Sequence, residues 1–347
     1  MRAADHSVLH VLPHAGGGGD TYVDLLNSMP GYRIKRVYLA PSRMSGPAAV
    51  ARGLAVVARR ARAHDVVHVH GEMAGALLLP LIVARPSVVT LHGLHLLRRV
   101  TGVRRRAAEL NLRAVVRAAD KTICVSNAEH HLLLTIVGRA TSGTVVVHNG
   151  TRVASPASAD ERHRVRSELG LARSDVVGIW VGSLDERRDP LAVVRAAERA
   201  STPLIVAGDG PLLAEVKQAA PEHVRVLGHR DDIPRLLDAA DFFVLMSHRE
   251  GLSFALLEAM AHGLPAIVAD VAENVEAVGD SGISVPYADE AAIATALRRL
   301  AEGADQRMTL GERARQRVTE YFSLDGMIAR TRAVYDDVLG ESGVLSA

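Results

Sequence analysis

Cysteine and lysine are both scarce in this sequence. Cys124 is the only cysteine among 347 residues, so an intramolecular disulfide is impossible and a cysteine-liganded zinc or iron–sulfur centre is not expected. Only three of the 41 basic residues are lysines, namely Lys35, Lys121 and Lys217. We interpret this arginine excess as the mark of a GC-rich genome rather than of a particular chemistry.

Long uninterrupted apolar runs are also missing. A membrane-spanning helix needs about 18 to 20 apolar residues, and the segments 74–83 and 244–261 are too short or carry charges. Residues 1–7 show no apolar run of the kind that a secretory signal requires. We therefore expect a soluble, cytoplasmic protein.

The composition that remains supports a large packed core. Hydrophobic residues make up 48% of the chain and charged residues 23%. At roughly 100 to 200 residues per domain, the length predicts two domains. Residues 1–150 carry 19 Lys or Arg against 8 Asp or Glu, whereas residues 151–347 carry 22 against 31. This split fits two domains that face different partners.

Short apolar segments alternate with longer helical patterns along the whole chain. The predicted strands are 8–12, 33–39, 66–70, 87–92, 121–125 and 144–148, then 176–181, 204–207, 224–227, 242–245, 266–269 and 283–285. Nearly continuous apolar strands are typical of parallel sheets covered on both faces. A polar stretch, 151–175, separates the two series. We therefore predict two doubly wound α/β domains, with ligands at the carboxyl ends of the strands.

The loop after the first predicted strand is rich in glycine. His14 and Ala15 precede Gly16–Gly19, and four glycines let a backbone approach a ligand closely at a helix N-terminus, where Asp20 could act as the cap. The spacing does not fit the dinucleotide-binding fingerprint, since its third glycine would fall on Thr21 or the next residue. A phosphate-contacting loop and a simple flexible turn both remain open.

The most informative segment is 248–265, which follows the predicted strand 242–245. A helix is expected to begin near Gly251 and Ser253, and Glu258 lies inside it among Ala, Leu and Met. A lone carboxylate in apolar surroundings is costly unless it meets a polar partner. A ribose or sugar hydroxyl would be such a partner, and the N-terminal amides of the helix could hold a phosphate.

Glu250 and Glu258, followed by Ala-Met-Ala-His-Gly-Leu-Pro, resemble the signature of the retaining glycosyltransferases of family four, which have the GT-B fold. Further segments match the family in order and spacing over nearly the whole chain: 125–129, 148–150, 181–190, 208–211, 228–233, 239–241, 269–274 and 321–325. The resemblance implies two Rossmann-like α/β domains that face each other across a cleft. Residues 1–155 would bind the acceptor, together with a crossover helix near 321–340, and residues 172–320 would bind the nucleotide sugar.

The resemblance also implies roles for individual residues. Glu258 would bind the ribose, Glu250 the transferred sugar, and the backbone around Arg230 the base. The donor site would comprise Gly16, Gly17, Gly18, Gly19, Ser183, Arg187, Arg188, Gly208, Gly210, Arg230, Glu250, Gly251, Leu252, Ser253, Phe254 and Glu258. His92 matches the family's histidine at the reactive face of the sugar, so the expected catalytic residues are His92, Glu250 and Arg188. His70 and His14 are weaker candidates for the acceptor side, and a histidine after a strand can also be purely structural.

One position departs from the family pattern. The family has an arginine directly after Gly182, where this chain has Ser183, and a lysine where it has Arg188. Positive charge aimed at the β-phosphate stabilises the leaving group, so Arg187 or an arginine of the first domain would have to compensate. Without compensation, activity would be low or absent. Arg187 and Arg188 could also be ordinary surface charges.

The expected chemistry is transfer of a sugar from a UDP-sugar or GDP-sugar with retention of anomeric configuration. No Asp-x-Asp metal motif lies near these loops, so helix amides and Arg188 would serve in place of a metal, and no cofactor is expected. By resemblance, the acceptor attacks on the face that the diphosphate leaves, and the departing phosphate accepts the acceptor's proton. The acceptor could be a glycan, a lipid-linked molecule or a small molecule.

Residues 96–121 form a basic, amphipathic stretch. Its basic residues are Arg98, Arg99, Arg104, Arg105, Arg106, Arg113, Arg117 and Lys121, interleaved with leucine and valine. Such a face can lie on an anionic membrane, which would place the protein at the inner surface of the membrane near a lipid-linked acceptor. A solvated helix face is the plainer interpretation. Nucleic acid is not expected, because the first half has few aromatic residues to stack on bases.

Other functions fit parts of the pattern. A non-catalytic nucleotide-sugar-binding subunit would explain Ser183. A nucleotide-sugar epimerase or a sugar phosphorylase would use the same fold. An NAD-dependent dehydrogenase is a further alternative for a double α/β chain, although the glycine spacing argues against it.

Overall fold

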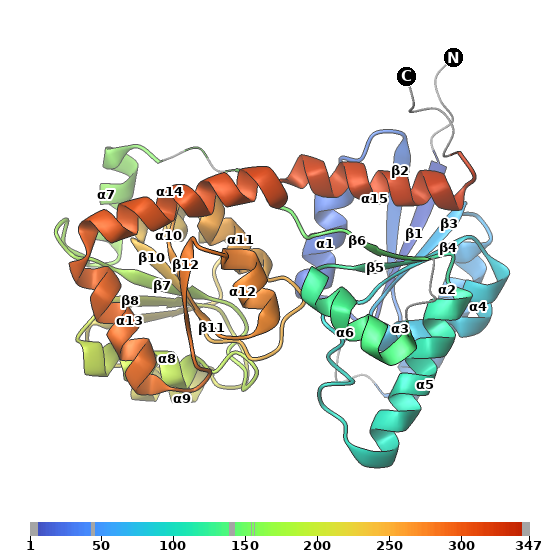
Figure 1. Ribbon diagram of the computed structural model, residues 1–347, viewed down its shortest axis with the longest axis horizontal. Helices are drawn as coiled ribbons and strands as arrows, with labels where there is room; N and C mark the ends of the chain where they lie inside the picture. Colours follow the sequence, from blue (N-terminus) through green and yellow to red (C-terminus); the bar gives the residue numbers. More distant parts are fainter. Residues whose placement is uncertain (1–5, 43–45, 139–142, 154, 156, 342–347) are drawn as a thin grey trace. The chain divides into compact units, whose positions relative to one another are not determined.

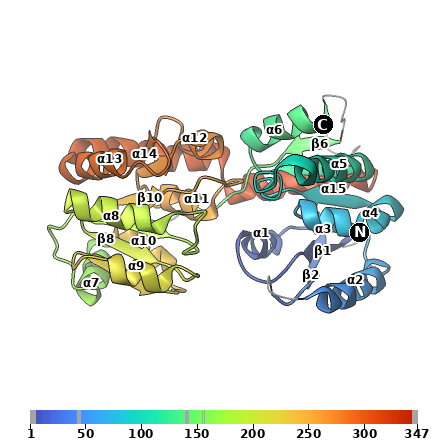
Figure 2. The same cartoon turned by 90° about the horizontal axis from the view of Figure 1, so that it is seen from below.

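The computed structural model describes residues 6–42, 46–138, 143–153, 155 and 157–341. The chain divides into two compact units, which we call unit 1 (Met1–Asn149 with Leu324–Ala347) and unit 2 (Gly150–Ser323). Each unit is built on a six-stranded sheet with helices on both faces (Figures 1 and 2). The predicted α/β fold class, with two parallel sheets, is confirmed.

The sheet of unit 1 has the strand order β2-β1-β3-β4-β5-β6, and its paired strands run parallel. Its strands are β1 (His6–Leu12), β2 (Tyr32–Tyr38), β3 (Val66–His70), β4 (Ser87–Thr90), β5 (Lys121–Cys124) and β6 (Thr144–Val146). Its helices are α1 (Gly18–Leu26), α2 (Pro47–Ala61), α3 (Glu72–Leu77), α4 (Leu79–Ala84), α5 (Gly102–Ala118), α6 (Asn127–Val137) and, from the end of the chain, α15 (Leu324–Val338). The chain passes from β1 to β2 on one side of β1 and then from β2 to β3 on its other side, so the strand order reverses between β1 and β3. Ligands of such sheets sit at this switch point.

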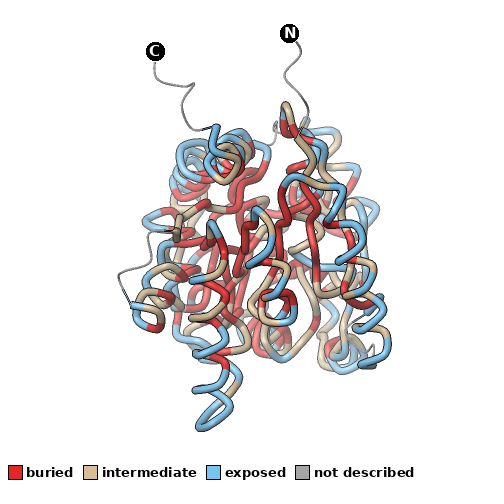
Figure 3. Tube along the Cα trace, turned by 90° about the vertical axis from the view of Figure 1, so that its right-hand side faces the viewer, coloured by how far each residue is buried: buried red, intermediate tan, exposed pale blue. Residues whose placement is uncertain are grey.

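Side chains of the unit 1 sheet alternate between two very different faces. On one face, Leu9, Val11, Val67 and Val69 join an apolar core with residues of α2 to α6. The other face carries His10, His68, His70 and Thr90, which lie near Tyr22 of α1 and Tyr335 of α15. Buried residues dominate the strands, whereas the outer sides of the helices are exposed (Figure 3).

The sheet of unit 2 has the order β12-β11-β10-β7-β8-β9, again with parallel pairs. Its strands are β7 (Gly178–Val181), β8 (Leu204–Ala207), β9 (Val224–Gly228), β10 (Phe242–Leu245), β11 (Ala266–Ala269) and β12 (Gly282–Val285). Its helices are α7 (Ala159–Glu168), α8 (Pro190–Ala200), α9 (Leu213–Ala219), α10 (Ile233–Ala239), α11 (Phe254–Ala261), α12 (Ala272–Val278), α13 (Glu290–Glu302) and α14 (Ala304–Tyr321). Here the strand order reverses between β7 and β10.

All twelve predicted strands are present, with shifts at their ends. The strand predicted over 87–92 ends at Thr90, because His92 adopts a positive φ of 62° that takes the chain out of the extended conformation. Helix α14 continues to Tyr321, and the break between α14 and α15 falls at Phe322 and Ser323. Among the described residues, no helix is long and apolar enough to cross a membrane.

Candidate active site

The switch point of unit 2 brings two arginines to one carboxylate. Arg187 Nη1 lies 3.4 Å from Glu250 Oε1, and Arg188 Nε lies 3.5 Å from the same oxygen. Glu250 is 7% exposed, so its charge is largely removed from water and is compensated by the two guanidinium groups. The loops after β7 and β10 supply these residues, and the predicted residues Arg187, Arg188 and Glu250 do lie together.

The loop that carries the arginines is fixed by its own backbone. His248 N donates to the carbonyl oxygen of Arg187 at 3.2 Å, which ties the two loops to each other. Arg188 N donates to Asp185 Oδ1 at 3.2 Å, and Asp189 caps α8 by accepting from Ala192 N. The guanidinium groups therefore extend from an anchored turn. Ser183 lies in the same loop, and its carbonyl oxygen accepts from Asp185 N at 2.9 Å.

Glycines let the neighbouring loops pack backbone against backbone. A Cβ on Gly208 would lie 1.8 Å from Gly182 O, and one on Gly210 would lie 2.6 Å from Leu184 O. Both positions also have a φ that side chains rarely adopt, +149° and +158°. The predicted donor-site glycines Gly208 and Gly210 therefore hold the loop after β8 directly against the loop that contains Ser183.

Helix α11 starts where the sequence pattern indicates. Ser253 is its N-cap and accepts from Leu256 N, while Gly251 and Leu252 lie buried just before it. Phe254 is the first helical residue. Burial raises the pKa of Glu258 to about 7, since water can no longer solvate the ionised carboxylate well. A ligand hydroxyl that donates to this carboxylate would favour its ionised form.

Arg230 lies on the loop between β9 and α10, next to the loop after β8 that contains Gly208. Its Nε and Nη2 atoms each donate to Asp232 at 2.7 Å, so the guanidinium forms a two-point ion pair within its own loop. Gly208 N donates to Gly228 O at 2.8 Å, which joins this loop to the one after β8. The sequence predicts that the backbone around Arg230 contacts the nucleotide base. The ion pair with Asp232 involves only the side chain of Arg230.

In unit 1, the glycine-rich loop passes directly into α1. Gly17 is the N-cap and Gly18 and Gly19 are helical, so the expectation that Asp20 caps this helix is wrong. Asp20 instead lies in the first turn and accepts from Gly16 N at 2.5 Å, and from Arg36 and Tyr38 at 2.7 Å each. Burial would raise the pKa of Asp20, but these hydrogen bonds outweigh it and lower that pKa.

His92 follows β4 in a strained backbone conformation. Its φ is +62°, that of Gly93 is +113° and that of Leu94 is +49°. The buried Glu129 carboxylate, at the start of α6, accepts from Gly93 N and from Val125 N at 2.8 Å, which holds the turn in place. Strain of this kind persists where surrounding structure imposes it, and it is concentrated at functional sites.

The two weaker acceptor-side candidates lie in different environments. His70 is buried and its two ring nitrogens contact His10 and His92 at 2.8 Å each, so it has almost no surface to offer an acceptor. Its predicted place on the acceptor side stays a prediction, and its contact with His92 links the two predicted residues. His14 is partly exposed, and its Nδ1 lies 2.9 Å from Ala15 O.

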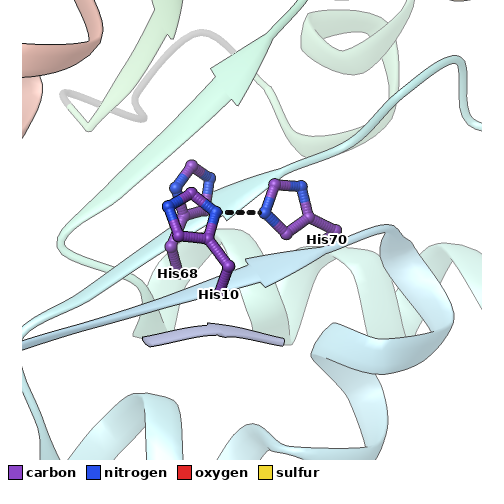
Figure 4. Close-up of side chains that lie close together, drawn as sticks. All are labelled: His10, His68 and His70. Atoms are coloured by element: carbon purple, nitrogen blue, oxygen red, sulfur yellow. Dashed lines mark hydrogen bonds between the residues drawn. The ribbon is translucent and has the colours of Figure 1, made fainter. Parts of the chain in front are cut away.

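The sequence reasoning missed three members of the group behind His92. These are His10, His68 and Tyr335 (Figure 4 shows His10, His68 and His70). The alternation in Val66-Val67-His68-Val69-His70 places both histidines on one face of β3, and this signal could have been used. Burial lowers the pKa of His10 and of His92 to about 3, and those of His68 and His70 well below 6.5. All four rings are therefore neutral at pH 7.

Two family models cover most of the chain. Residues 1–154 match Glycosyltransferase Family 4, and residues 176–303 match Glycosyl transferases group 1. The chain belongs to these glycosyltransferases. Relatives support the assignment: it is 28% identical over 187 residues to the N-acetyl-alpha-D-glucosaminyl L-malate synthase of Bacillus anthracis. It is 29% identical over 234 residues to the UDP-Gal:alpha-D-GlcNAc-diphosphoundecaprenol alpha-1,3-galactosyltransferase of Escherichia coli.

These two matches cover 51% and 61% of this chain, and they span 49% and 59% of the lengths of the two relatives. Solved structures match over a larger share. The sucrose-phosphate synthase of Thermosynechococcus elongatus has a TM-score of 0.80 at 19% identity, covering 96% of this chain and 99% of that one. Anabaena HepE, in complex with UDP and glucose, has a TM-score of 0.78 at 19% identity, covering 93% and 98%. These likenesses show the GT-B fold.

Proposed function

We propose that this chain transfers a glycosyl group from a nucleoside-diphosphate sugar to an acceptor hydroxyl. The observation that carries the proposal is the placement of Arg187 and Arg188 at the Glu250 carboxylate, at the switch point of the unit 2 sheet. A diphosphate that leaves a sugar gains negative charge, and fixed cations in a partly dry site stabilise that charge. Glu250 would accept hydrogen bonds from the transferred sugar.

The proposal gives Arg187 the role of the arginine that the family has at the position of Ser183. Arg187 and Arg188 approach the same oxygen from one anchored turn, so two cations are available although position 183 is a serine. Arg187 also donates to the carbonyl oxygen of Arg249 at 3.2 Å, which fixes it toward the loop that precedes α11. We therefore assign to Arg187 the second leaving-group contact.

The donor is proposed to be a UDP-sugar, with a GDP-sugar as the alternative. The name of the Escherichia coli relative specifies UDP-Gal, and HepE was solved with UDP and glucose. Glu258, with its pKa raised by burial, would hold the ribose hydroxyls. The two names support a uridine nucleotide without identifying the sugar that this chain would transfer, whereas a ribose contact at Glu258 would be common to UDP and GDP.

The transfer is proposed to retain anomeric configuration and to proceed without a metal. Two arginines and the N-terminal amides of α11 supply positive charge where a metal ion would otherwise be needed. The departing phosphate oxygen would accept the acceptor's proton on the face that it leaves. Proton NMR of the product distinguishes the outcomes, since an inverted anomer contradicts the proposal, and turnover that requires an added divalent cation contradicts its metal independence.

Thermal stabilisation by nucleotides tests donor binding directly. UDP, GDP, ADP and NAD are each added at millimolar concentration with EDTA. A ligand at about 100 times its Kd adds roughly 2.7 kcal/mol, which raises Tm measurably. A shift with UDP or GDP alone supports the proposal. A shift with NAD would favour a dehydrogenase, and the absence of any shift would exclude tight donor binding.

The acceptor is proposed to be lipid-linked and reached through peripheral contact with an anionic membrane. Arg104, Arg105 and Arg106 are exposed on α5, beside Val103, which is 82% exposed, and Leu110. Met73 and Leu77 of the adjoining helix α3 are exposed as well. Exposed basic and apolar side chains on neighbouring helices are consistent with a peripheral membrane contact. The Escherichia coli relative is named for a diphosphoundecaprenol acceptor.

Sedimentation with vesicles tests this contact. The intact chain should bind phosphatidylserine-containing vesicles at low salt and be released at high salt. Replacing Arg104, Arg105 and Arg106 with glutamine should abolish binding, whereas the same change at Arg298 and Arg313 of unit 2 should not. Wild-type protein that stays in the supernatant would favour a small soluble acceptor.

A further inference from the structure

The polar face of the unit 1 sheet contains a continuous row of hydrogen-bonding groups. His92 Nε2 lies 2.8 Å from His70 Nδ1, and His70 Nε2 lies 2.8 Å from His10 Nδ1. His10 Nε2 lies 3.2 Å from Tyr335 Oη, which is 2.6 Å from His68 Nδ1. The row ends where His68 Nε2 lies 2.7 Å from Thr90 Oγ1. All its members except His92 are fully buried.

The geometry identifies these contacts as hydrogen bonds rather than metal ligation. Among the described residues, His10, His68 and His70 have ring atoms within 4.8 Å of one another, close enough to suggest a metal site. However, the His10 and His70 rings have near-parallel planes, at 21°, with centroids 5.1 Å apart and nitrogens at 2.8 Å. This is an edge-to-edge arrangement in which the two nitrogens face each other (Figure 4). Zinc ligands must instead both point to a third position, about 2.0 Å from each.

Neutral imidazoles in such a row share one tautomer. Each ring has one N–H donor and one bare nitrogen, and each contact needs one of each. Two arrangements satisfy every contact and also give the buried Tyr335 hydroxyl an acceptor within the row. Either all four rings carry the proton on Nε2, so that the donors point from His92 toward Thr90, or all four carry it on Nδ1 and the donors point back.

The distances at Tyr335 select between the two arrangements. The contact of 2.6 Å to His68 is shorter than the usual N–H···O range and lies within that of a hydroxyl donor, whereas 3.2 Å to His10 is at the long end of the range for an N–H donor. These distances favour Tyr335 as the donor to His68 Nδ1 and as the acceptor from His10 Nε2, which corresponds to the proton on Nε2 throughout the row.

We propose that His10, His68, His70 and Tyr335 are positioning residues that lock His92 in the Nε2–H tautomer, with its Nδ1 presented as a hydrogen-bond acceptor. A ligand at His92 must then bring a donor, such as a sugar hydroxyl, and His92 is no donor to a phosphate or carbonyl oxygen. The lowered pKa values of the four rings agree, since burial and the nearby Arg36 and His95 oppose a positive charge. The consequence for transfer rests on the proposed function, but the tautomer does not.

Nitrogen NMR of the full chain with 15N-labelled histidine tests the lock. Wild-type protein should show His10, His68, His70 and His92 all neutral, with protonated Nε2 and bare Nδ1, at pH 7. Tyr335→Phe keeps the ring volume but removes the hydroxyl, so His10 Nε2–H would lose its acceptor and His92 should shift toward the Nδ1–H form. Tyr32→Phe is the matched control, because it removes a hydroxyl that donates to Asp336 on the same helix α15 and keeps the ring that packs against Tyr335, with centroids 5.3 Å apart.

A second variant tests the same proposal in case Tyr335→Phe does not fold. Thr90→Val removes the acceptor at the end of the row with little change in volume. His68 Nε2–H would then be a buried unsatisfied donor, so the whole row should reverse to Nδ1–H. Unchanged tautomers in both variants, mixed tautomers in the wild type, or stoichiometric binding of Co²⁺ that His10→Leu abolishes would overturn the proposal.

Transfer activity supplies a separate readout. In Tyr335→Phe, kcat should fall in proportion to the fraction of His92 in the Nδ1–H form, while the Kd for UDP stays unchanged. Loss of both would indicate a merely structural role and contradict the lock. If the wild type transfers no sugar, the proposed function fails while the NMR result still decides the tautomer.

Discussion

At the scale of single residues, the arginines of the loop after β7 decide whether leaving-group stabilisation is possible. By the family resemblance, Arg188 stands where the family has a lysine, and Arg187 is the residue beside it. Their contacts with Glu250, at 3.5 and 3.4 Å, place both charges at one point. Under the proposed function, Arg187 would supply the cation that position 183 lacks.

We predict that Arg187→Gln and Arg188→Gln each lower kcat by about 10²-fold, the usual cost of losing one donor to developing charge. Ser183→Arg should restore most of the loss in the Arg187→Gln background, since it returns a cation to the family's position. Arg195→Gln, which breaks an exposed ion pair with Glu290, is the matched control. Full activity in Arg187→Gln would show that Arg187 is an ordinary surface charge.

Glu258 gives a second prediction at this scale. Its pKa of about 7 leaves it half protonated at neutral pH, and ribose hydroxyls that donate to it would lower that pKa. UDP binding should therefore release roughly half a proton at pH 7 and tighten as pH rises through 7. Calorimetry in two buffers of different ionisation enthalpy measures this release. Glu258→Gln should remove that release and leave only protons that come from the phosphate, so an unchanged value would exclude the ribose contact.

At the scale of elements, the histidine-bearing face of the unit 1 sheet makes stability depend on pH. His10 has a pKa of about 3 when folded against 6.5 when unfolded, so its contribution is complete above pH 6.5 and is lost as pH falls toward 3. At pH 5 the loss is roughly 2 kcal/mol for His10 alone. His68, His70 and His92 shift in the same direction.

We therefore predict that unit 1 loses stability between pH 7 and pH 5 more steeply than unit 2. The single tryptophan, Trp180, is fully buried in β7, so its fluorescence reports the unfolding of unit 2. Amide hydrogen exchange in β1 and β3 reports unit 1. A change of pH that shifts both signals equally, or neither, would contradict the assignment of neutral, buried histidines.

At the scale of the whole molecule, the strands can be predicted from the sequence far better than the distant residues that pack against them. All twelve strands could be predicted because continuous Val, Ile and Leu runs between breakers mark buried parallel strands. Arg187, Arg188 and Glu250 were expected at one site from the family resemblance, and the structure shows that their loops follow strands at a switch point. Tyr335 could not be predicted, since it is 325 residues from His10 in the chain and meets it only because α15 packs on the unit 1 sheet.

The strained backbone of His92 and the burial of His70 could not be predicted from the sequence either. Nothing in Leu91-His92-Gly93 indicates that His92 has a positive φ, because that conformation is imposed by Glu129 through Gly93. The burial of His70 depends on Tyr22 and the neighbouring rings rather than on its own strand. Local pattern identifies which residues share a face, whereas tertiary packing decides what covers that face.

The central claim is that the chain is an active transferase that uses a UDP-sugar. Release of UDP from a panel of UDP-sugars, with EDTA present and with and without candidate acceptors, measures this most directly. We predict slow UDP release by the wild type that an acceptor accelerates, and a loss of about 10²-fold in Arg188→Gln. No UDP release from any donor, by protein that UDP nevertheless stabilises, would contradict the account and identify a nucleotide-sugar-binding subunit.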